Sequence, residues 1–520
     1  MAEADGMLRP LVEPVPPVWD EEADVVVVGC GFAGAVAAIR VQDAGGRVVL
    51  LEKAARPGGI SVCSAGGLRI ARDADAALRY LIRTNGGTTP EPVLRALAEG
   101  MAALPEVAKA LAEGHGAHVG LRESPANYPF DGFETFGFAY VDELDGFDYE
   151  RDYPDVRGNP EGARLFGLLE RNLAARGIVP RCLTPVETLI RDASGAVVGV
   201  RASGPQGDIR IKARGGVILA CGGFEGNEEM QRQYWPMQPV LNAAYRGNTG
   251  DGIRMSQEAG ADLWHMWHFH GSYGFRHSDP AYPFGIRTKR LPDWRPGEGP
   301  RGDVRLPWVL LDRFGRRFMN EYEPYLQDTG ARPMARYAPE VQDFQALPAW
   351  LVSDEAGAAL WPFGRPTWHE PGVGYEWSQD NARELANGIL RRTESLKDLA
   401  AGIGAEPAVL AASIAAWNDA CAAGQDALWS RPPSSMVPIQ GPPFIYAPVW
   451  PIISNTQGGP VHDEYQRVIH ASGRPIPGLY AAGECGSAFG FLYMSGGNIA
   501  ECFIGGGIAA ADAMARAGRG

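Results

Sequence analysis

Three glycines near the N-terminus have the spacing of a loop that binds phosphate. Gly29, Gly31 and Gly34 follow the β-branched run 25–28 and open an alanine-rich stretch. In a G-x-G-x-x-G loop the first glycine permits a tight turn, the second lets the backbone approach a pyrophosphate, and the third packs helix on strand. Glu52 follows 18 residues after Gly34, where a carboxylate accepts a hydrogen bond from a ribose hydroxyl. These residues predict dinucleotide binding, and the carboxylate disfavours NADP.

The elements that must position this loop form a β-α-β unit of about 30 residues. Residues 23–29 are typical of a short buried parallel strand, and residues 47–51 predict a second strand that ends at Glu52. A helix pattern lies between them, over residues 35–44. Further helices are expected over 91–113, 161–176 and parts of 380–425, and another buried strand over 216–220.

Two further glycine-rich segments distinguish a flavin from a nicotinamide. Residues 58–67 come soon after Glu52, and residues 477–484 have the pattern of a strand that ends in an acid. A nicotinamide enzyme needs neither segment, whereas a flavin dinucleotide threaded through the domain would use both.

Six segments together resemble the fumarate reductase/succinate dehydrogenase flavoprotein superfamily, to which the 3-ketosteroid dehydrogenases belong. They are residues 25–34, 58–67, 217–226, 248–252, 315–321 and 475–484, and they extend over most of the chain. The resemblance implies an α/β protein with a Rossmann-like FAD-binding domain and an inserted α+β substrate (capping) domain. Succinate dehydrogenases attach their flavin through a histidine in the segment that matches 58–67. No histidine stands there, so non-covalent FAD is expected.

The resemblance and the glycine motifs also imply which residues surround FAD. The helix that follows residues 495–498 is expected to direct its positive N-terminal dipole at the flavin pyrimidine ring. The expected FAD-binding residues are Gly29, Gly31, Phe32, Ala33, Gly34, Glu52, Lys53, Gly59, Ile60, Ser61, Ser64, Gly66, Gly67, Gly222, Gly223, Asn248, Asp251, Gly483, Glu484, Gly497, Asn498 and Ile499.

The groups with which fumarate reductases bind a dicarboxylate are absent from the matching positions. The arginine expected after the 317–321 segment is replaced by tyrosine. The histidine expected before Thr456-Gln-Gly-Gly459 is missing, and Met494 stands where a further arginine is usual. Burying a dicarboxylate without these groups would cost several kcal/mol per charge. Fumarate reduction is therefore excluded as the predicted activity.

Tyrosines take their place, and they suit a ketone. The segment that ends at Tyr325 resembles the one that carries the proton-abstracting tyrosine of 3-ketosteroid Δ1-dehydrogenases. Tyr493-Met-Ser495 and residues 263–266 more closely resemble the Δ4-(5α)-dehydrogenases. By this resemblance Tyr325 is the base or its relay, and Tyr493 donates to the carbonyl with help from the backbone of Gly497. Ser495 is a relay or second donor.

The predicted reaction is α,β-desaturation of an apolar cyclic ketone, for which a 3-ketosteroid is the leading example. The polarised carbonyl acidifies the α carbon, a base takes its proton, and the hydride of the β carbon passes to flavin N5. Tyr322 competes with Tyr325 for the role of base, and either tyrosine could instead be a core aromatic. The electrons must leave to a quinone, an electron-transfer protein or dioxygen.

Three histidines, His265, His268 and His270, are interleaved with aromatic residues. No Cys or Glu clusters with them, so a pocket wall is favoured over a metal site, and no metal is expected. A histidine here could still relay protons.

Composition shifts predict the domain boundaries. Residues 266–345 are rich in aromatics, proline and arginine, and a proline-rich link precedes the last glycine-dense block. We expect an N-terminal arm over 1–19, an FAD-binding domain made of 20–265 and 435–520, and the capping domain over 266–434.

Charge and cysteine content exclude other classes of protein. The 520 residues carry 48 Lys+Arg and 62 Asp+Glu, a formal net charge of −14, which argues against nucleic acid as a partner. No apolar stretch reaches the roughly 18 residues of a membrane span, and the first residues lack a secretory signal. Seven cysteines without a CxxC pair indicate a reducing cytoplasm, the expected location.

Two other functions remain open at this point. One is an ene-reductase that runs the same transfer backwards on an enone or an unsaturated acid. The other is a flavin-binding redox protein without catalysis, in which the tyrosines only fill the core.

Overall fold

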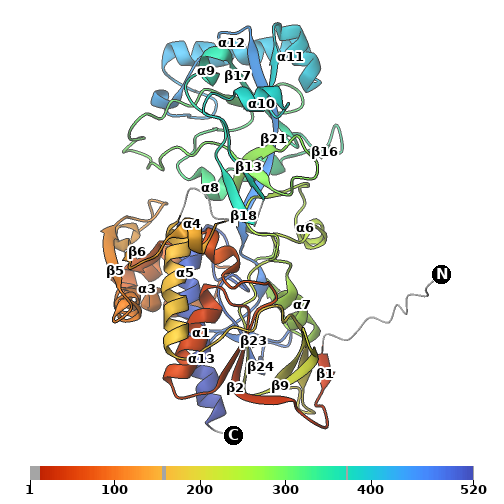
Figure 1. Ribbon diagram of the computed structural model, residues 1–520. Coiled ribbons are helices and arrows are strands. Elements are labelled where there is room, and N and C mark those ends of the chain that lie inside the picture. Colours follow the sequence, from red (N-terminus) through yellow and green to blue (C-terminus); the bar gives the residue numbers. More distant parts are fainter. Residues whose placement is uncertain (1–11, 155–159, 371–372, 519–520) are drawn as a thin grey trace, which may run out of the picture.

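The computed structural model describes residues 12–154, 160–370 and 373–518. Two parts are stacked on each other, with both described ends of the chain in the lower part (Figure 1). Most of the expected N-terminal arm, residues 1–11, lies outside the described residues. Strand β1 (Val12–Pro14) pairs in parallel with β7 (Val186–Arg191), so this part of the arm extends a sheet.

The main sheet of the lower part has a parallel centre. Strand β2 (Glu21–Val28) lies between β3 (Val48–Leu51) and β9 (Gly207–Leu219), and the end of β9 also pairs with β24 (Pro475–Ala481). Val26 pairs with Val217, as buried β-branched residues do in a sheet covered on both faces. Antiparallel strands complete the sheet: β7, β8 (Val197–Gly204) and β23 (Arg467–Ile469).

Three helices cover one face of this sheet (Figure 1). They are α1 (Phe32–Asp43), α5 (Glu161–Ala175) and α13 (Gly497–Ala517). α1 and α13 approach closely because Gly506 has no side chain: a Cβ there would lie 2.5 Å from the carbonyl oxygen of Ala33. The predicted β-α-β unit and the predicted helices over 91–113 and 161–176 are thus confirmed.

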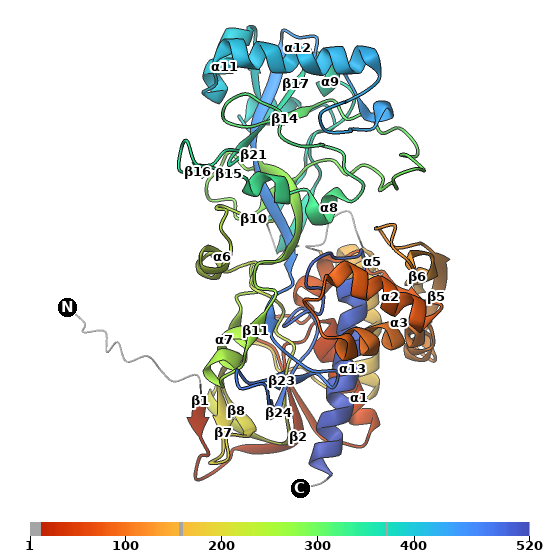
Figure 2. The same cartoon turned by 180° about the vertical axis from the view of Figure 1, so that it is seen from behind.

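A small sheet stands beside these helices (Figure 2). It consists of β4 (Leu68–Ala71), β6 (Phe136–Leu144) and β5 (Ala117–Glu123), and it packs with α2 (Ala74–Asn85) and α3 (Glu91–Ala112). Short helices in the lower and connecting regions are α4 (Tyr149–Asp152), α6 (Glu228–Tyr234) and α7 (Asp251–Glu258).

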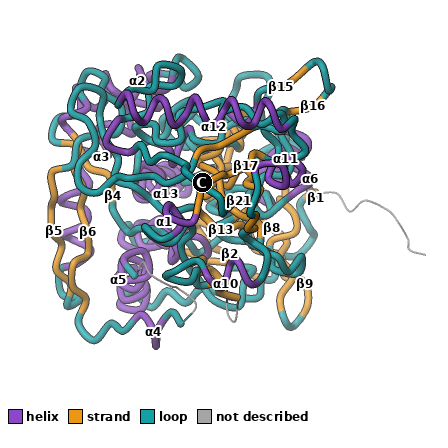
Figure 3. The backbone as a smooth tube through the Cα atoms, turned by 90° about the horizontal axis from the view of Figure 1, so that it is seen from above, coloured by secondary structure: helices purple, strands orange, loops and turns teal. Residues whose placement is uncertain are grey.

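The upper part is built on a second sheet, in the order β13-β12-β21-β17-β14. These strands are β13 (Gly285–Arg287), β12 (Phe269–Arg276), β21 (Phe444–Thr456), β17 (Ala349–Asp354) and β14 (Val309–Leu311), and β10 (Leu241–Asn242) and β20 (Arg391–Thr393) also pair with β21. Its helices are α8 (Leu326–Thr329), α9 (Glu355–Ala358), α10 (Ala382–Ala386), α11 (Leu396–Ile403) and α12 (Pro407–Ala423). α11 and α12 lie over the far end, seen from above in Figure 3.

Short two-stranded ladders complete the fold. They are β11 (Leu263–Trp264) with β22 (Gly459–Pro460), β15 (Tyr337–Ala338) with β16 (Asp343–Phe344), and β18 (Thr367–Glu370) with β19 (Val373–Tyr375).

The strand pairings move one boundary relative to the sequence prediction. β21, expected in the FAD-binding domain from residue 435 on, pairs instead with the capping strands β12 and β17. The proline-rich link is packed rather than free, because the buried guanidinium of Arg431 donates to the carbonyl oxygens of Trp308 and Leu306. A proline-rich composition here therefore does not mark a domain border.

Among the described residues, no single helix has the length and apolar character needed to cross a membrane; α11 and α12 meet both criteria only as a pair, bent by 111°.

Candidate active site

The glycine loop opens one end of an elongated cavity. Residues 28–33, Glu52, Lys53 and residues 58–61 line this end, where about 800 Å³ is free of protein atoms, including space open to solvent. The first turn of α1 faces it, where backbone N–H groups lack acceptors within the helix. Gly34 lies behind the lining, because a Cβ there would lie 1.9 Å from the carbonyl oxygen of Gly29.

Glu52 fixes the shape of this end. Its carboxylate accepts hydrogen bonds from the backbone N–H of Cys30, at 2.9 Å, and of Ala54, at 2.8 Å. Lys53 pairs with Asp251, at 2.6 Å between Nζ and Oδ2. Gly222, Asn248 and Asp251 complete the opposite wall. An adenosine and a pyrophosphate fit this set of glycines, helix N-terminus and carboxylate.

A second cavity continues from the first towards the capping domain. The two share Phe32, Ile60, Ser61, Glu484 and Cys502 as lining residues. The second cavity encloses about 1160 Å³ and is also lined by Ser64, Gly67, Asn498 and Ile499. One continuous space thus runs from the glycine loop to the start of α13, which fits an extended dinucleotide with a flavin ring at the far end.

Four predicted FAD-binding glycines lie behind this surface rather than on it. Gly66 packs against the backbone of Glu161, Gly223 against Thr456, and Gly483 against Cys502. The N–H of Gly497 donates to the carbonyl oxygen of Met494 at 2.9 Å. Together with Gly34, these glycines shape the cavity through close packing.

Two buried carboxylates meet where the two cavities join. Glu484 accepts from the backbone N–H of Thr456 at 2.8 Å, and the amide of Asn248 donates to both Glu225, at 2.7 Å, and Glu484, at 3.3 Å. Burial, followed by the charge of Glu484, raises the pKa of Glu225 well above its ordinary value. Burial also raises the pKa of Glu484 to about 7. At least one of the two carboxyls is therefore protonated near neutral pH.

His270 projects into the second cavity from β12. A bulge between His270 and Gly271 breaks the ladder with β21, and such bulges redirect a side chain. The His270 Nδ1 lies 3.1 Å from the Oδ1 of Asn455, which can only accept. The tautomer assigned from this contact carries its proton on Nδ1. Nε2 is buried without a partner, and burial lowers the pKa of His270 to about 4. The neutral imidazole thus carries an unpartnered lone pair on Nε2, an atom that is itself buried in the wall of the cavity.

Tyr493 lies against His270, with 4.4 Å between the ring centroids. Its hydroxyl oxygen accepts from the backbone N–H of Asn498 at 3.4 Å, at the start of α13. Its backbone N–H donates to the buried carboxylate of Asp328 at 3.0 Å. Burial raises the pKa of Tyr493 above its ordinary value, so the phenol keeps a proton that it can donate into the cavity.

The other predicted catalytic residues divide into lining and supporting groups. Ser495 lines the second cavity, and its backbone is held by Asn127 and Arg69. Tyr325 is only 2% exposed and does not line this cavity; its ring stacks on His270 at 6.2 Å. Burial raises the pKa of Tyr325 well above its ordinary value. The hydroxyl of Tyr322 donates to the carbonyl of Pro292 at 2.5 Å, outside this cavity.

The 315–321 segment builds a structural ion cluster. Glu321 is fully buried and pairs with Arg317, at 2.8 Å, and with Arg431, at 3.2 Å. Arg317 also pairs with Asp426 at 3.1 Å. This cluster anchors the chain just before Tyr322 and Tyr325.

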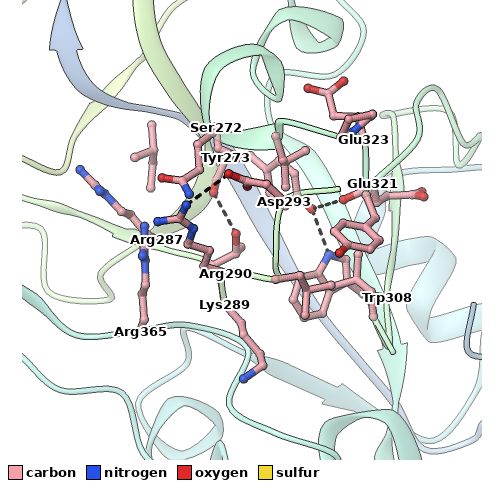
Figure 4. A pocket seen from close by; sticks show the side chains of 18 of the residues that line it. Ser272, Tyr273, Arg287, Lys289, Arg290, Asp293, Trp308, Glu321, Glu323 and Arg365 are labelled. Carbon is pink, nitrogen blue, oxygen red and sulfur yellow. Dashed lines mark hydrogen bonds and ion pairs between the residues drawn. The ribbon is translucent and has the colours of Figure 1, made fainter. Parts of the chain in front are cut away.

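The sequence analysis did not identify three arginines that also face the cavity. Arg287, Arg290 and Arg365 line both the second cavity and a neighbouring pocket of the capping domain, shown in Figure 4. Arg287 ends the short strand β13 and the other two lie outside helices and strands, and none of the three stands in a recognisable motif. In the described part of the chain, no group of three or more His, Cys, Asp or Glu side chains is arranged to hold a metal ion.

Comparison with known proteins identifies the family. Residues 24–499 match the family described as FAD binding domain. The chain belongs to this family of flavoproteins. Its cofactor is FAD, and the flavoprotein is an oxidoreductase of the fumarate reductase group.

Two curated relatives have different activities. The flavoprotein is 27% identical to digoxin reductase of Eggerthella lenta, over 95% of this chain and 85% of the relative. It is 29% identical to 4-oxocyclohex-2-ene-1-carboxylate 5-dehydrogenase of Sinomonas cyclohexanicum, over 65% of this chain and 57% of the relative.

Two solved structures share the fold. One is 3-ketosteroid Δ1-dehydrogenase of Sterolibacterium denitrificans, with a TM-score of 0.76 and 23% identity over 95% of this chain and all of that one. The other is 3-ketosteroid Δ4-(5α)-dehydrogenase of Rhodococcus jostii, with a TM-score of 0.67 and 22% identity over 98% of this chain and all of that one. The resemblance inferred from the motifs and the fold class are thereby confirmed.

Proposed function

We propose that this flavoprotein desaturates a cyclic ketone between its α and β carbons. The observation that carries the proposal is the pairing of a proton donor with a proton acceptor at the flavin end of the cavity. Tyr493 offers a phenolic proton, and His270 offers a lone pair on Nε2. Desaturation needs both, one to polarise the carbonyl and one to take the α proton.

In this proposal Tyr493 donates to the ketone oxygen. Its hydroxyl oxygen already accepts the N–H of Asn498, which leaves its own proton free to point at a ligand. Polarisation of the carbonyl makes the α C–H bond more acidic. Ser495 lies in the same wall and is the second donor.

His270 takes the α proton at Nε2. The sequence pattern favours Tyr325 for this role, but Tyr325 does not line the cavity, whereas His270 does, and a phenol must ionise before it can accept a proton. A neutral imidazole accepts a proton without prior ionisation. Tyr325 then acts as a positioning residue, because its ring packs against His270.

The atoms balance as a two-electron oxidation. The α carbon loses a proton to His270, its bonding electrons form the new C=C bond, and the β hydrogen leaves with its electron pair. FAD, when bound, supplies the acceptor for that hydrogen and electron pair. An external acceptor, such as a quinone, an electron-transfer protein or dioxygen, must then remove the electrons. A cyclic ketone as substrate is supported by the similarity to 4-oxocyclohex-2-ene-1-carboxylate 5-dehydrogenase and to the two 3-ketosteroid dehydrogenases.

The test is anaerobic mixing of the FAD-loaded protein with a panel of cyclic ketones, neutral and charged. We expect the absorbance of oxidised flavin to bleach with at least one saturated ketone and the matching enone to accumulate. If no ketone in the panel bleaches the flavin, the proposal is wrong and a non-catalytic flavoprotein is favoured.

A second candidate is reduction of an enone, which the similarity to digoxin reductase favours. Here the same two residues work in reverse, with His270 returning the proton. Chemically reduced protein mixed with the enone would then reoxidise within a turnover, while the ketone would leave the oxidised flavin unchanged.

A further inference from the structure

Two arginines of the capping domain emerge side by side at the cavity. Arg287 ends β13, and the backbone N–H of Arg365 donates to its carbonyl at 3.0 Å. The adjacent bond from Lys289 N–H to the carbonyl of Phe363, at 2.7 Å, holds the two segments together. Figure 4 shows both side chains on the same side of the pocket. Both line the second cavity together with His270 and Tyr493.

The charges of these two arginines are not balanced by the protein. Among the side chains that the structure describes, no carboxylate lies within ion-pair distance of Arg287 or Arg365. The side chain of Arg287 donates from Nη2 to the carbonyl oxygen of Ala243, at 3.0 Å. The Nε of Arg365 is buried with no acceptor. Two guanidinium groups thus lie near each other without a counter-ion among the described side chains.

Elsewhere the same domain pairs its buried arginines. Arg317 and Arg431 share the carboxylate of Glu321. Arg290, the third arginine of the cavity wall, is exposed and also has a carboxylate nearby, Asp293 at 3.4 Å. The lack of a described carboxylate partner at Arg287 and Arg365 is therefore specific to the cavity, because other buried arginines of the same domain have one.

The electrostatic consequence is a site prepared for an anion. Burial lowers the pKa of Arg287 to about 10 and that of Arg365 well below its ordinary range, and each lies near other guanidinium groups. Burying an unpaired charge is costly, and a planar carboxylate matches the donor fork of arginine.

We infer that Arg287 and Arg365 bind a carboxylate group of the substrate. The inference rests on the proposed function, because it concerns the same cavity. The substrate class is then a cyclic keto acid, with its carbonyl at Tyr493 and its carboxylate at a ring position turned towards the capping domain. A wholly apolar ketone, as expected from the sequence, would leave both charges unpaired.

Binding is tested first without chemistry. The probe is cyclohexane-1-carboxylate, which has no ketone, titrated into FAD-loaded protein and followed by the flavin spectrum and by thermal shift. We expect saturable binding that weakens about 10- to 100-fold in Arg287→Met and Arg365→Met. Sulfate at equal ionic strength is expected to give no saturable shift. The matched control is Arg305→Met, since Arg305 is an exposed capping arginine paired with Asp303.

Chemistry is tested with 4-oxocyclohexane-1-carboxylate and its methyl ester in anaerobic flavin reduction. We expect the acid to act at least about 10-fold more efficiently than the ester, with the preference lost in Arg365→Met. Arg365→Lys keeps the positive charge but not the two parallel N–H donors of a guanidinium group. Its preference for the acid over the ester should lie between that of the wild type and that of Arg365→Met. If a variant fails to fold, the comparison of acid and ester on the wild type still decides.

The outcomes separate the two proposals. If the ester reduces the flavin as well as the acid, the carboxylate site is refuted and the desaturase stands. If the acid analogue binds through the arginines but no ketone reduces the flavin, the site stands and the desaturase is refuted. The carboxylate site is also refuted if Arg287→Met and Arg365→Met both bind cyclohexane-1-carboxylate with the affinity of the wild type.

Discussion

His270 and Tyr493 face each other at 4.4 Å between ring centroids and present opposite hydrogen-bonding functions to one cavity. The imidazole offers a lone pair because Asn455 holds its proton on the other nitrogen. The phenol offers a proton because Asn498 occupies its oxygen. A donor and an acceptor are thus fixed side by side by partners from β21 and α13.

Tyr493→Phe is expected to slow flavin reduction by about 10²–10³-fold, the usual cost of removing one donor to a developing oxyanion. FAD should remain bound, because the hydroxyl is the only group removed. Stopped-flow absorbance with the best ketone measures the rate, and the flavin-to-protein absorbance ratio measures occupancy. Reduction at the wild-type rate would remove Tyr493 from the mechanism.

His270→Gln is expected to slow flavin reduction by about 10²–10⁴-fold, since an amide cannot accept the proton. Tyr325→Phe, the matched variant, should cost far less, because it keeps the ring that packs on His270. The reverse order of the two effects would return the role of base to Tyr325.

His265 and His270 should each contribute a loss of stability as the pH falls from about 6.5 to about 4, opposite in sign to the contribution of the buried carboxyls Glu225 and Glu484. The folded-state pKa values of both histidines are lowered to about 4 by burial, from an ordinary 6.5. The unfolded chain therefore binds protons on these histidines first on acidification, and the stabilising contribution present above pH 6.5 disappears. Melting temperatures at several pH values should show a smaller loss on acidification in His270→Gln than in the wild type; His265 and His462, whose pKa burial also lowers, remain in both proteins.

Glu225→Gln is expected to stabilise the FAD-loaded protein at alkaline pH. The pKa values of Glu225 and Glu484 are raised in the folded state, so their contribution is favourable in acid and is lost as the pH rises through about 7. An amide at position 225 removes the repulsion, worth about 1 kcal/mol or more. Urea unfolding at pH 6 and pH 8.5 should show the gain mainly at pH 8.5; an equal gain at both would contradict this origin.

Glu321→Gln is expected to destabilise the protein by about 3–5 kcal/mol, because it leaves the buried guanidinium group of Arg431 without a carboxylate and Arg317 with Asp426 alone. Asp343→Asn is the matched control, since it breaks an exposed pair with Arg313 and should cost at most about 1 kcal/mol. Chemical denaturation measures both. Similar losses in the two variants would show that burial of the cluster does not matter.

The nucleotide end of the site could be predicted from the sequence because its determinants are local. Gly29, Gly31 and Glu52 sit at fixed offsets within one β-α-β unit, and the fold brings them to one cavity wall. Tyr493 and Ser495 could be predicted for the same reason. They lie just before α13, whose start the sequence pattern indicates, and both line the second cavity.

The substrate end could not be predicted in the same way because its residues meet only through tertiary pairing. Arg287 and Arg365 are distant in sequence and lie on segments without periodicity, joined by a few backbone hydrogen bonds. In the sequence His270 cannot be distinguished from His265 and His268, which are also flanked by aromatic residues. The β-bulge beside His270 directs its side chain into the cavity, and the sequence does not reveal that bulge. The pairing of β21 with β12 and β17 could not be predicted from the sequence, because proline content does not report strand pairing.

Strand β21 connects the capping sheet to the residues of the flavin cavity. Most of the strand belongs to the capping sheet, yet its last residues, Asn455 and Thr456, bond to His270 and to Glu484 at the flavin cavity. Asn455 pairs with His270 across β21 and β12, so a rigid-body swing of the cap would carry both residues together and keep the tautomer. Tyr493 precedes α13 in the other part of the molecule, so the same swing would separate the phenol from the imidazole, and the donor and the acceptor are assembled only when the two parts are seated against each other.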